Sequence, residues 1–219
     1  MQQFAVIGVG NFGAYLARRL YEKGDEVLVI DNNADRIQEI RDRVSRAIVA
    51  DATDPKVLAS LDLDQMDAVT VSVGDNIAAA ILITLNLKDI NVKRLAVKTV
   101  SEPQGRVLQK VGATEVLFPE KDMALTLAER LYSPNVLEYL PFMEDYSIIE
   151  MTPPAHTVGK PLRELDLINR YGIQIIAIKE IAPERMNMVP TATYVMKDSD
   201  ILIVLGSREG IEKMRADTA

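Results

Sequence analysis

The sequence predicts a doubly wound α/β domain, in which helices cover both faces of a parallel sheet, followed by a small α+β domain. Three observations support this fold class. Short apolar segments alternate with helical patterns six times in residues 1–132. These segments are too continuous for strands with one solvated face, which indicates parallel strands that are buried on both sides. A glycine-rich turn, Gly8-Val-Gly-Asn-Phe-Gly13, joins the first strand directly to the first helix.

Hydrophobic periodicity and helix start and stop signals define the elements of the first domain. β-Rich runs predict six strands, at Gln3–Ile7, Glu26–Ile30, Ala47–Ala50, Asp67–Val73, Lys93–Lys98 and Glu115–Phe118. Apolar residues at helical spacing predict helices at Asn11–Glu22, Ala34–Arg43, Pro55–Leu61, Asn76–Leu87, from Ser101 to near Gly112, and at Lys121–Tyr132. Right-handed crossovers then bring the loops after the strands to one edge of the sheet.

The pattern changes near residue 140, where prolines interrupt the chain. We therefore expect a first, nucleotide-binding domain at residues 1–140 and a second domain at residues 145–219. β-Rich runs in the second part predict strands at Ser147–Met151, Ile173–Glu180, Ala192–Val195 and Ile201–Leu205, with short helices at Pro161–Leu165 and Glu209–Arg215. A domain of this size is too small to be the substrate domain of a typical dehydrogenase.

Composition argues against several classes of function. The chain has no cysteine, which excludes disulfides, Cys-ligated metals and thiol catalysis, and His156 is its single histidine. A net charge of −7 disfavours nucleic acid as a partner. The apolar runs are shorter than the roughly 20 residues that cross a bilayer, so we expect a soluble, unprocessed protein. No Gly-x-Ser-x-Gly nucleophile motif occurs.

The glycine-rich turn is a dinucleotide fingerprint in its proper context, between a strand and a helix. Gly8 permits the tight turn, Gly10 lets a phosphate approach the backbone, and Gly13 allows close packing of helix and strand. The backbone N–H groups of Asn11 and Phe12 at the helix start are expected to face the phosphates. Eighteen residues beyond Gly13, a carboxylate ends the second strand, at Asp31. An acid there accepts hydrogen bonds from ribose hydroxyls and repels a 2′-phosphate, which disfavours NADP.

Further candidates lie after the other strands of the predicted sheet. The binding-site candidates outside the glycine turn are Asp31, Asn32, Asp51, Ala52, Thr53, Ser72, Val73, Gly74, Asn76, Lys98 and Glu120. The turn at residues 51–53 would lie beside an adenine, although Thr53 or Asp54 could instead cap the next helix. Lys98 fits either a phosphate contact or an ordinary solvated lysine. Glu120 fits either a ligand contact or a carboxylate that stabilises a helix start.

Together these motifs resemble the RCK, or KTN, regulatory subunits of potassium transport, of the KtrA and TrkA type. The resemblance rests on Gly8-x-Gly-x-Phe-Gly13, Asp51-Ala-Thr-Asp54, Lys98, Val111-Gly-Ala113, Pro119-Glu-Lys-Asp-Met123 and Asn135-Val-Leu-Glu-Tyr-Leu140. In the second domain it rests on Gly159-Lys-Pro-Leu162, Tyr171-Gly172, Ile175-Ile-Ala-Ile-Lys179 and Asp200-Ile-Leu-Ile-Val204, which look like a TrkA-C domain.

The resemblance implies a cytoplasmic regulatory ring, typically an octamer, that is peripheral to the membrane through a potassium-translocating subunit. It implies no catalysis, but switching by ATP and ADP in the glycine-loop site. Glu120 would lie near the phosphates at a subunit contact, where a divalent cation could bridge. We expect the segment Pro119–Leu140 to be exchanged between neighbouring subunits.

Two departures from the family pattern affect the choice of ligand. Asn11 stands where these subunits usually carry an arginine, so ADP, AMP or NAD fit as well as ATP. Ile168 and Gln174 stand where relatives that bind cyclic di-AMP carry Arg and Asn, which argues against that ligand. The alternative function is an NAD-dependent oxidoreductase or an NAD(H) sensor. A dehydrogenase also needs an acid or base at the nicotinamide end, and no histidine is available there.

Overall fold

The computed structural model describes residues 1–74, 76–132, 136–141 and 146–217. The chain forms two compact units, Met1–Lys121 and Asp122–Ala219. This division falls earlier than the expected boundary between residues 140 and 145, and residues 142–145 lie outside the described residues. None of the helices within the described ranges has both the length and the hydrophobicity that a membrane span requires.

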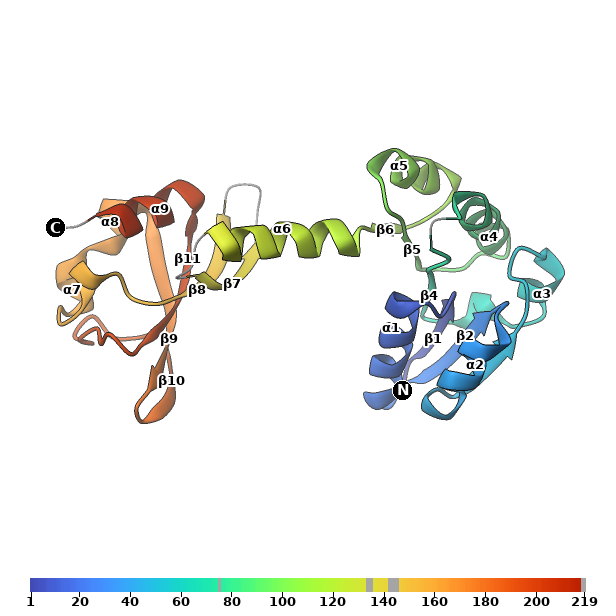
Figure 1. The fold of residues 1–219 in the computed structure, drawn as a ribbon, viewed down its shortest axis with the longest axis horizontal. Helices are drawn as coiled ribbons and strands as arrows, with labels where there is room; N and C mark the ends of the chain where they lie inside the picture. The colour runs from blue at the N-terminus through green and yellow to red at the C-terminus, as the bar shows by residue number, and fades with distance from the viewer. Residues whose placement is uncertain (75, 133–135, 142–145, 218–219) are drawn as a thin grey trace. The chain divides into compact units, whose positions relative to one another are not determined.

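The first unit, drawn in blue to green in Figure 1, contains a parallel six-stranded sheet with the order β3-β2-β1-β4-β5-β6. Its strands are β1 Gln3–Ile7, β2 Glu26–Asp31, β3 Arg46–Val49, β4 Ala68–Val71, β5 Leu95–Lys98 and β6 Glu115–Leu117. Its helices are α1 Asn11–Glu22, α2 Ala34–Ile40, α3 Pro55–Ala59, α4 Ile77–Asp89, α5 Glu102–Val111 and α6 Pro119–Tyr132, which continues into the second unit. The predicted doubly wound fold is therefore confirmed.

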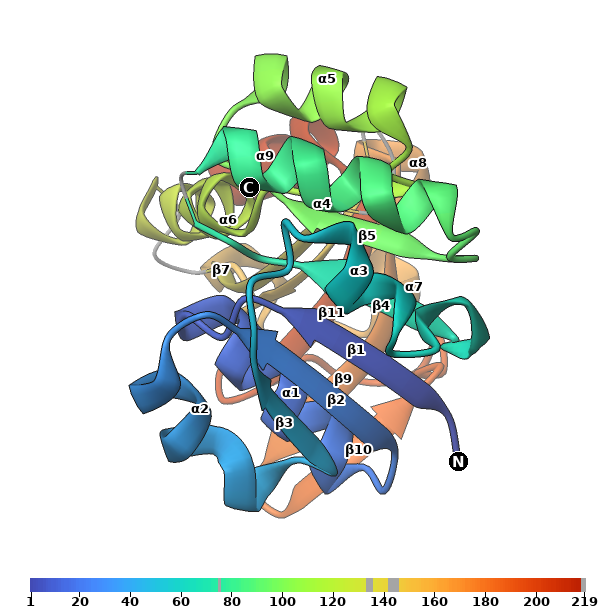
Figure 2. The ribbon, with the colours of Figure 1, turned by 90° about the vertical axis from the view of Figure 1, so that its right-hand side faces the viewer.

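Helices and strands of this unit form layers (Figure 2), and two hydrophobic cores, one on each face of the sheet, hold these layers together. Successive residues of β1 point to opposite faces: Val6 packs with α1 and α2, whereas Ala5 and Ile7 pack with α3, α4 and α5. Alternation of this kind, with apolar residues on both sides, is the cause of the continuous apolar strands in the sequence. The fold thus brings the carboxyl ends of all six strands to one edge.

The second unit is built on an antiparallel sheet with the order β10-β9-β11-β8-β7. Its strands are β7 Val136–Pro141, β8 Tyr146–Met151, β9 Ile173–Ile181, β10 Glu184–Met188 and β11 Ile201–Ser207. Its short helices are α7 Leu162–Leu165, α8 Leu167–Tyr171 and α9 Arg208–Ala216. Buried residues of α7, α8 and α9 pack on β8, β9 and β11 to form one core.

The strand predicted at Ala192–Val195 is wrong. Residues 192–195 lie in a loop, in which only Val195 forms an isolated bridge, to Pro161. The carbonyl of Tyr194 in this loop accepts a hydrogen bond from the N–H of Leu162. Conversely, β10 was not predicted, because its sequence, Glu-Arg-Met-Asn-Met, has no β-branched or aromatic residue. Hairpin pairing with β9, from Glu184 opposite Ile181 onward, makes it a strand. Pairing with β9 thus makes this segment a strand, although its own residues have a weak preference for β structure.

Candidate functional site

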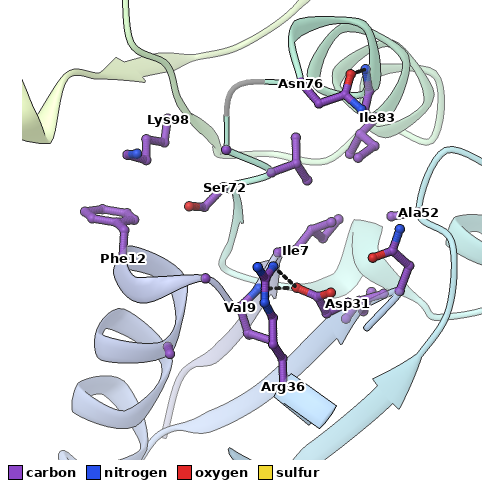
Figure 3. Close-up of a pocket in the computed structure, with 18 of the residues that line it drawn as sticks. Ile7, Val9, Phe12, Asp31, Arg36, Ala52, Ser72, Asn76, Ile83 and Lys98 are labelled. Carbon is purple, nitrogen blue, oxygen red and sulfur yellow. Dashed lines mark hydrogen bonds and ion pairs between the residues drawn. The ribbon is translucent and has the colours of Figure 1, made fainter. Parts of the chain in front are cut away.

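The first unit has a cavity of about 690 Å³ at the carboxyl edge of its parallel sheet (Figure 3). It lies at the carboxyl ends of the neighbouring strands β1 and β4, the point at which the strand order reverses, and ligands of open α/β sheets bind at such points. Its volume is in the range of small-molecule sites, roughly 300–1,000 Å³. Every site residue predicted from the sequence lines this cavity except Gly13. The fold thus brings the predicted residues other than Gly13 together around one cavity. Their contacts with a ligand stay predictions.

The three glycines of the turn have different physical roles. A Cβ at Gly13 would lie 2.0 Å from the carbonyl oxygen of Gly8, and one at Gly8 would lie 2.3 Å from that of Ser72. Gly8 also has a φ of +90°, which L-residues rarely adopt. A Cβ at Gly10 would meet nothing within 4 Å. Gly8 and Gly13 thus let backbones pack closely, whereas Gly10 leaves open space for a ligand.

The start of α1 has no side-chain cap. Its N-cap, Gly10, provides no side-chain hydrogen bond, and the first turn carries no acidic residue. Gly10, Asn11 and Phe12 all line the cavity. The first N–H groups of a helix have no partner within the helix, and the helix dipole favours negative charge beside them. Such a helix start favours the binding of a phosphate group.

Asp31 is buried and accepts hydrogen bonds within the chain. Figure 3 shows its contacts with Val9 and Arg36. Its Oδ2 accepts a hydrogen bond of 2.7 Å from the N–H of Val9, and its Oδ1 accepts one of 2.8 Å from the N–H of Asn33. Nη1 of Arg36 lies 3.7 Å from Oδ2. Asp31 therefore connects the end of β2 to the glycine turn. This structural role was not predicted from the sequence.

The turn after β3 is stabilised by Asp51. Its Oδ1 accepts hydrogen bonds from the hydroxyl and the N–H of Thr53, at 2.7 and 2.9 Å. The hydroxyl contact is the main cause that lowers the pKa of Asp51. Asp54, not Thr53, caps α3 by accepting from the N–H of Lys56, so the capping interpretation holds for Asp54. Asp51 instead lines the cavity and remains a ligand candidate.

Lys98 and Glu120 form an ion pair at the other end of the cavity. Nζ of Lys98 lies 2.6 Å from Oε1 of Glu120, and this hydrogen bond lowers the pKa of the Glu120 carboxyl. The Lys98 side chain is only 12% exposed, so it is not a solvated surface lysine. In the described part of the chain, no group of three or more His, Cys, Asp or Glu side chains is arranged for a metal. The role of Glu120 as a metal ligand stays a prediction.

The structure adds residues that the motifs did not indicate. Tyr15, Arg18, Arg36 and Glu39 line the cavity on its α1 and α2 side. The sequence position of Arg36 could have indicated that it lies near the cavity, because it follows Asp31 by five residues and lies in the first turn of the next helix. Asn76 lines the cavity and also caps α4, accepting a 3.1 Å hydrogen bond from the N–H of Ala79.

In the second unit, Arg170 is engaged by its neighbours. Its Nη2 lies 2.8 Å from Oδ2 of Asp217, which also accepts a hydrogen bond from the Tyr171 hydroxyl. Ile168, in the position that the family comparison singled out, is 64% exposed. The expectation that cyclic di-AMP does not bind stays a prediction.

The fold and the cavity define a class: a Rossmann-type domain with a pocket at its switch point, joined to a small antiparallel-sheet domain. Comparison of the sequence with protein families identifies the TrkA-N domain at residues 4–119 and the TrkA-C domain at residues 146–218. The chain belongs to the TrkA family that these two domains define, and the resemblance to RCK regulatory subunits is confirmed.

Curated relatives match nearly from end to end. The chain is 40% identical to the Ktr system potassium uptake protein C of Bacillus subtilis, over 97% of this chain and 95% of that protein. It is 36% identical to the Ktr system potassium uptake protein A of Vibrio alginolyticus, over 95% and 94% of the two chains. These proteins are potassium uptake components by name.

Solved structures share the fold. The GsuK channel matches with a TM-score of 0.69 at 16% identity, over 98% of this chain and 39% of the channel chain. A structure described as the GsuK channel bound to NAD matches with a TM-score of 0.64 at 17% identity, over 97% and 38%. The chain thus spans less than half of the length of these channel chains.

Proposed function

We propose that the chain is the nucleotide-binding regulatory subunit of a Ktr/Trk-type potassium uptake system. The observation that carries this proposal is the 40% identity to a Ktr potassium uptake protein over almost the whole of both chains. In this proposal residues 1–140 form the nucleotide-binding domain and residues 145–219 the TrkA-C domain. The subunit assembles with its own copies on the inner face of the membrane, through a potassium-translocating partner.

The ligand of the cavity, in this proposal, is an adenine nucleotide, ATP or ADP. The uncapped start of α1 offers backbone donors to phosphates, and Asp31 lies on the side where a ribose would be held. At the opposite end, Lys98 and Glu120 face the same cavity. Glu120 can help to hold a divalent cation that is bound to the phosphates, because a carboxylate oxygen is a suitable ligand for such a hard cation.

NAD or NADH is the second candidate ligand, and one feature of the cavity favours it. The lining runs from the turn after β3, at Asp51, across the switch point to Lys98 on β5. This span covers both halves of a dinucleotide site. A redox reaction would need an acid or base beside the nicotinamide, and no histidine lines the cavity. A sensor of NAD(H) needs no such group.

A thermal-shift series tests the proposal. The purified chain is melted alone and with ATP, ADP, NADH and cyclic di-AMP, each with and without Mg²⁺. An adenine nucleotide at about 100 times its Kd should stabilise the fold by roughly 2.7 kcal/mol. The absence of any shift with every adenosine compound would contradict the proposal. A shift with NADH alone, together with turnover of a metabolite, would favour an oxidoreductase.

A further inference from the structure

Arg36 crowds one of the acceptor positions of Asp31 that a ribose would use. An ionised carboxylate has about four lone-pair sites. The N–H groups of Val9 and Asn33 take one site on each oxygen, which leaves one on each. Nη1 of Arg36 stands beside Oδ2 (Figure 3). The open position on Oδ1 is therefore uncrowded and the one on Oδ2 is not, whereas the 2′- and 3′-hydroxyls of a ribose offer two donors.

Of the three partners of Asp31, Arg36 is the one that can leave. The two backbone donors are fixed by the glycine turn and by the start of α2. The Arg36 contact, at 3.7 Å, is longer than a hydrogen bond, and its side chain is 54% exposed. Ion pairs with one exposed partner contribute little to stability. A second ribose hydroxyl can thus take the place of Arg36 on Oδ2.

A displaced Arg36 would remain inside the ligand site, because it lines the same cavity. The other charged side chains that line this cavity are Asp31, Glu39, Asp51 and Glu120 on the acidic side and Arg18 and Lys98 on the basic side. The carboxylate of Asp31, beside Arg36, disfavours an additional phosphate there, whereas it does not disfavour the neutral face of a purine. A guanidinium stacks well on such a flat ring, since it is planar and weakly hydrated.

We propose that Arg36 determines the specificity of the cavity for ribonucleotides with a purine base. The ribose hydroxyls displace it from Asp31, and its guanidinium then covers the face of the base. This inference rests on the proposed function, since it assumes that an adenine nucleotide occupies the cavity.

Calorimetric titration of ADP and 2′-deoxy-ADP into the wild-type chain and the variants Arg36→Met and Arg36→Lys tests the proposal. Arg36→Met should weaken ADP binding roughly tenfold, as expected for the loss of a partly desolvated cation–π contact. Arg36→Lys keeps the charge without the planar face, so its affinity should lie between the other two. The single ribose hydroxyl of 2′-deoxy-ADP fits the open position on Oδ1, so Arg36→Met should change its affinity less than about twofold.

Arg41→Met is the matched control, because Arg41 is 57% exposed and lies next to the end of α2, outside the cavity. It should bind both nucleotides as the wild type does, and all unliganded variants should melt alike. The proposal is overturned if Arg36→Met binds ADP like the wild type, or loses equal affinity for both nucleotides. Tighter binding of NADPH than of NADH by the wild type would also overturn it, since Arg36 would then serve a phosphate. If the wild type binds no adenosine compound, the proposed function itself fails, a result that the variants cannot mimic.

Discussion

At the scale of single residues, we expect Gly13 to matter for the stability of the fold and Gly10 for ligand binding. Gly13→Ala places a Cβ 2.0 Å from a backbone carbonyl oxygen, a clash that no side-chain movement relieves. We expect it to lower the free energy of unfolding by about 1–3 kcal/mol or more, as overpacking does. Gly10→Ala meets no atom and has an ordinary φ of −64°, so it should unfold like the wild type yet bind ADP more weakly. Urea unfolding with ADP titration measures both, and equal stability of the two variants would contradict this assignment.

Asp31 combines a structural role with its expected ribose contact, and its variants should show both. Asp31→Ala leaves the N–H of Val9, a buried residue, without its acceptor. An unpaired buried donor costs about 1–3 kcal/mol, so this variant should melt lower as well as lose nucleotide binding. Asp31→Asn keeps one acceptor oxygen and should retain more stability than affinity. Differential scanning calorimetry and ADP titration measure the two effects, and a wild-type affinity in either variant would exclude the ribose role.

The residues of the site could be predicted from the sequence to the extent that they follow strands. Gly8, Asp31 and Lys98 were found because the carboxyl ends of parallel strands share one edge. The bond between Asp31 and Val9 could not be found in this way. It depends on how two chain segments about 22 residues apart meet in space, which no local pattern encodes.

At the scale of elements, the two sheets differ in how far the sequence determines them. Strands β1 and β2 of the parallel sheet are buried on both faces, so each is an apolar run that is visible without its neighbours. In the antiparallel sheet, β10 is an edge strand whose residues are mostly exposed, with no apolar alternation to reveal it. Such a strand exists because β9 offers it a partner. Prediction therefore failed where pairing, not burial, determines the structure.

An ion pair between Lys197 and Glu180 leads to a prediction about how the stability of the second unit depends on pH. Nζ of Lys197 lies 2.5 Å from Oε2 of Glu180 on β9, and this hydrogen bond lowers the pKa of Glu180 and raises that of Lys197. The pair thus stabilises the fold between the ordinary pKa values of Glu, about 4.3, and Lys, about 10.4. Its contribution is lost as pH falls through the lowered pKa of Glu180, or rises through the raised pKa of Lys197.

Melting temperatures between pH 3 and pH 7 test this expectation. Lys197→Met should melt below the wild type at pH 7, and the difference should shrink as the pH falls and Glu180 becomes protonated. Lys213→Met, at an exposed position of α9, is the control and should follow the wild type throughout. A difference between Lys197→Met and the wild type that does not depend on pH would assign the effect to packing of the lysine stem.

At the scale of the whole molecule, α6 carries an apolar surface that the single chain leaves exposed. Met123, Leu125, Leu127 and Leu131 are 65%, 57%, 48% and 74% exposed. Soluble monomers rarely expose several large apolar side chains on one helix, so such a surface indicates a protein interface. A second copy of the chain is the partner that fits the expected exchange of residues 119–140. Residues 133–135 of that segment lie outside the described residues.

The double variant Leu127→Glu/Leu131→Glu should therefore reduce the molar mass of the particle in solution. Two carboxylates in an apolar contact must lose their hydration without gaining a partner, which is costly. Light scattering coupled to size-exclusion chromatography measures the mass of the wild type and the variant at micromolar concentration. Met186→Glu is a matched control, because Met186 is 49% exposed, close to the 48% of Leu127, and lies on β10. A monomeric wild type, or an equal loss of mass in the control, would show that α6 is not the surface through which the copies associate.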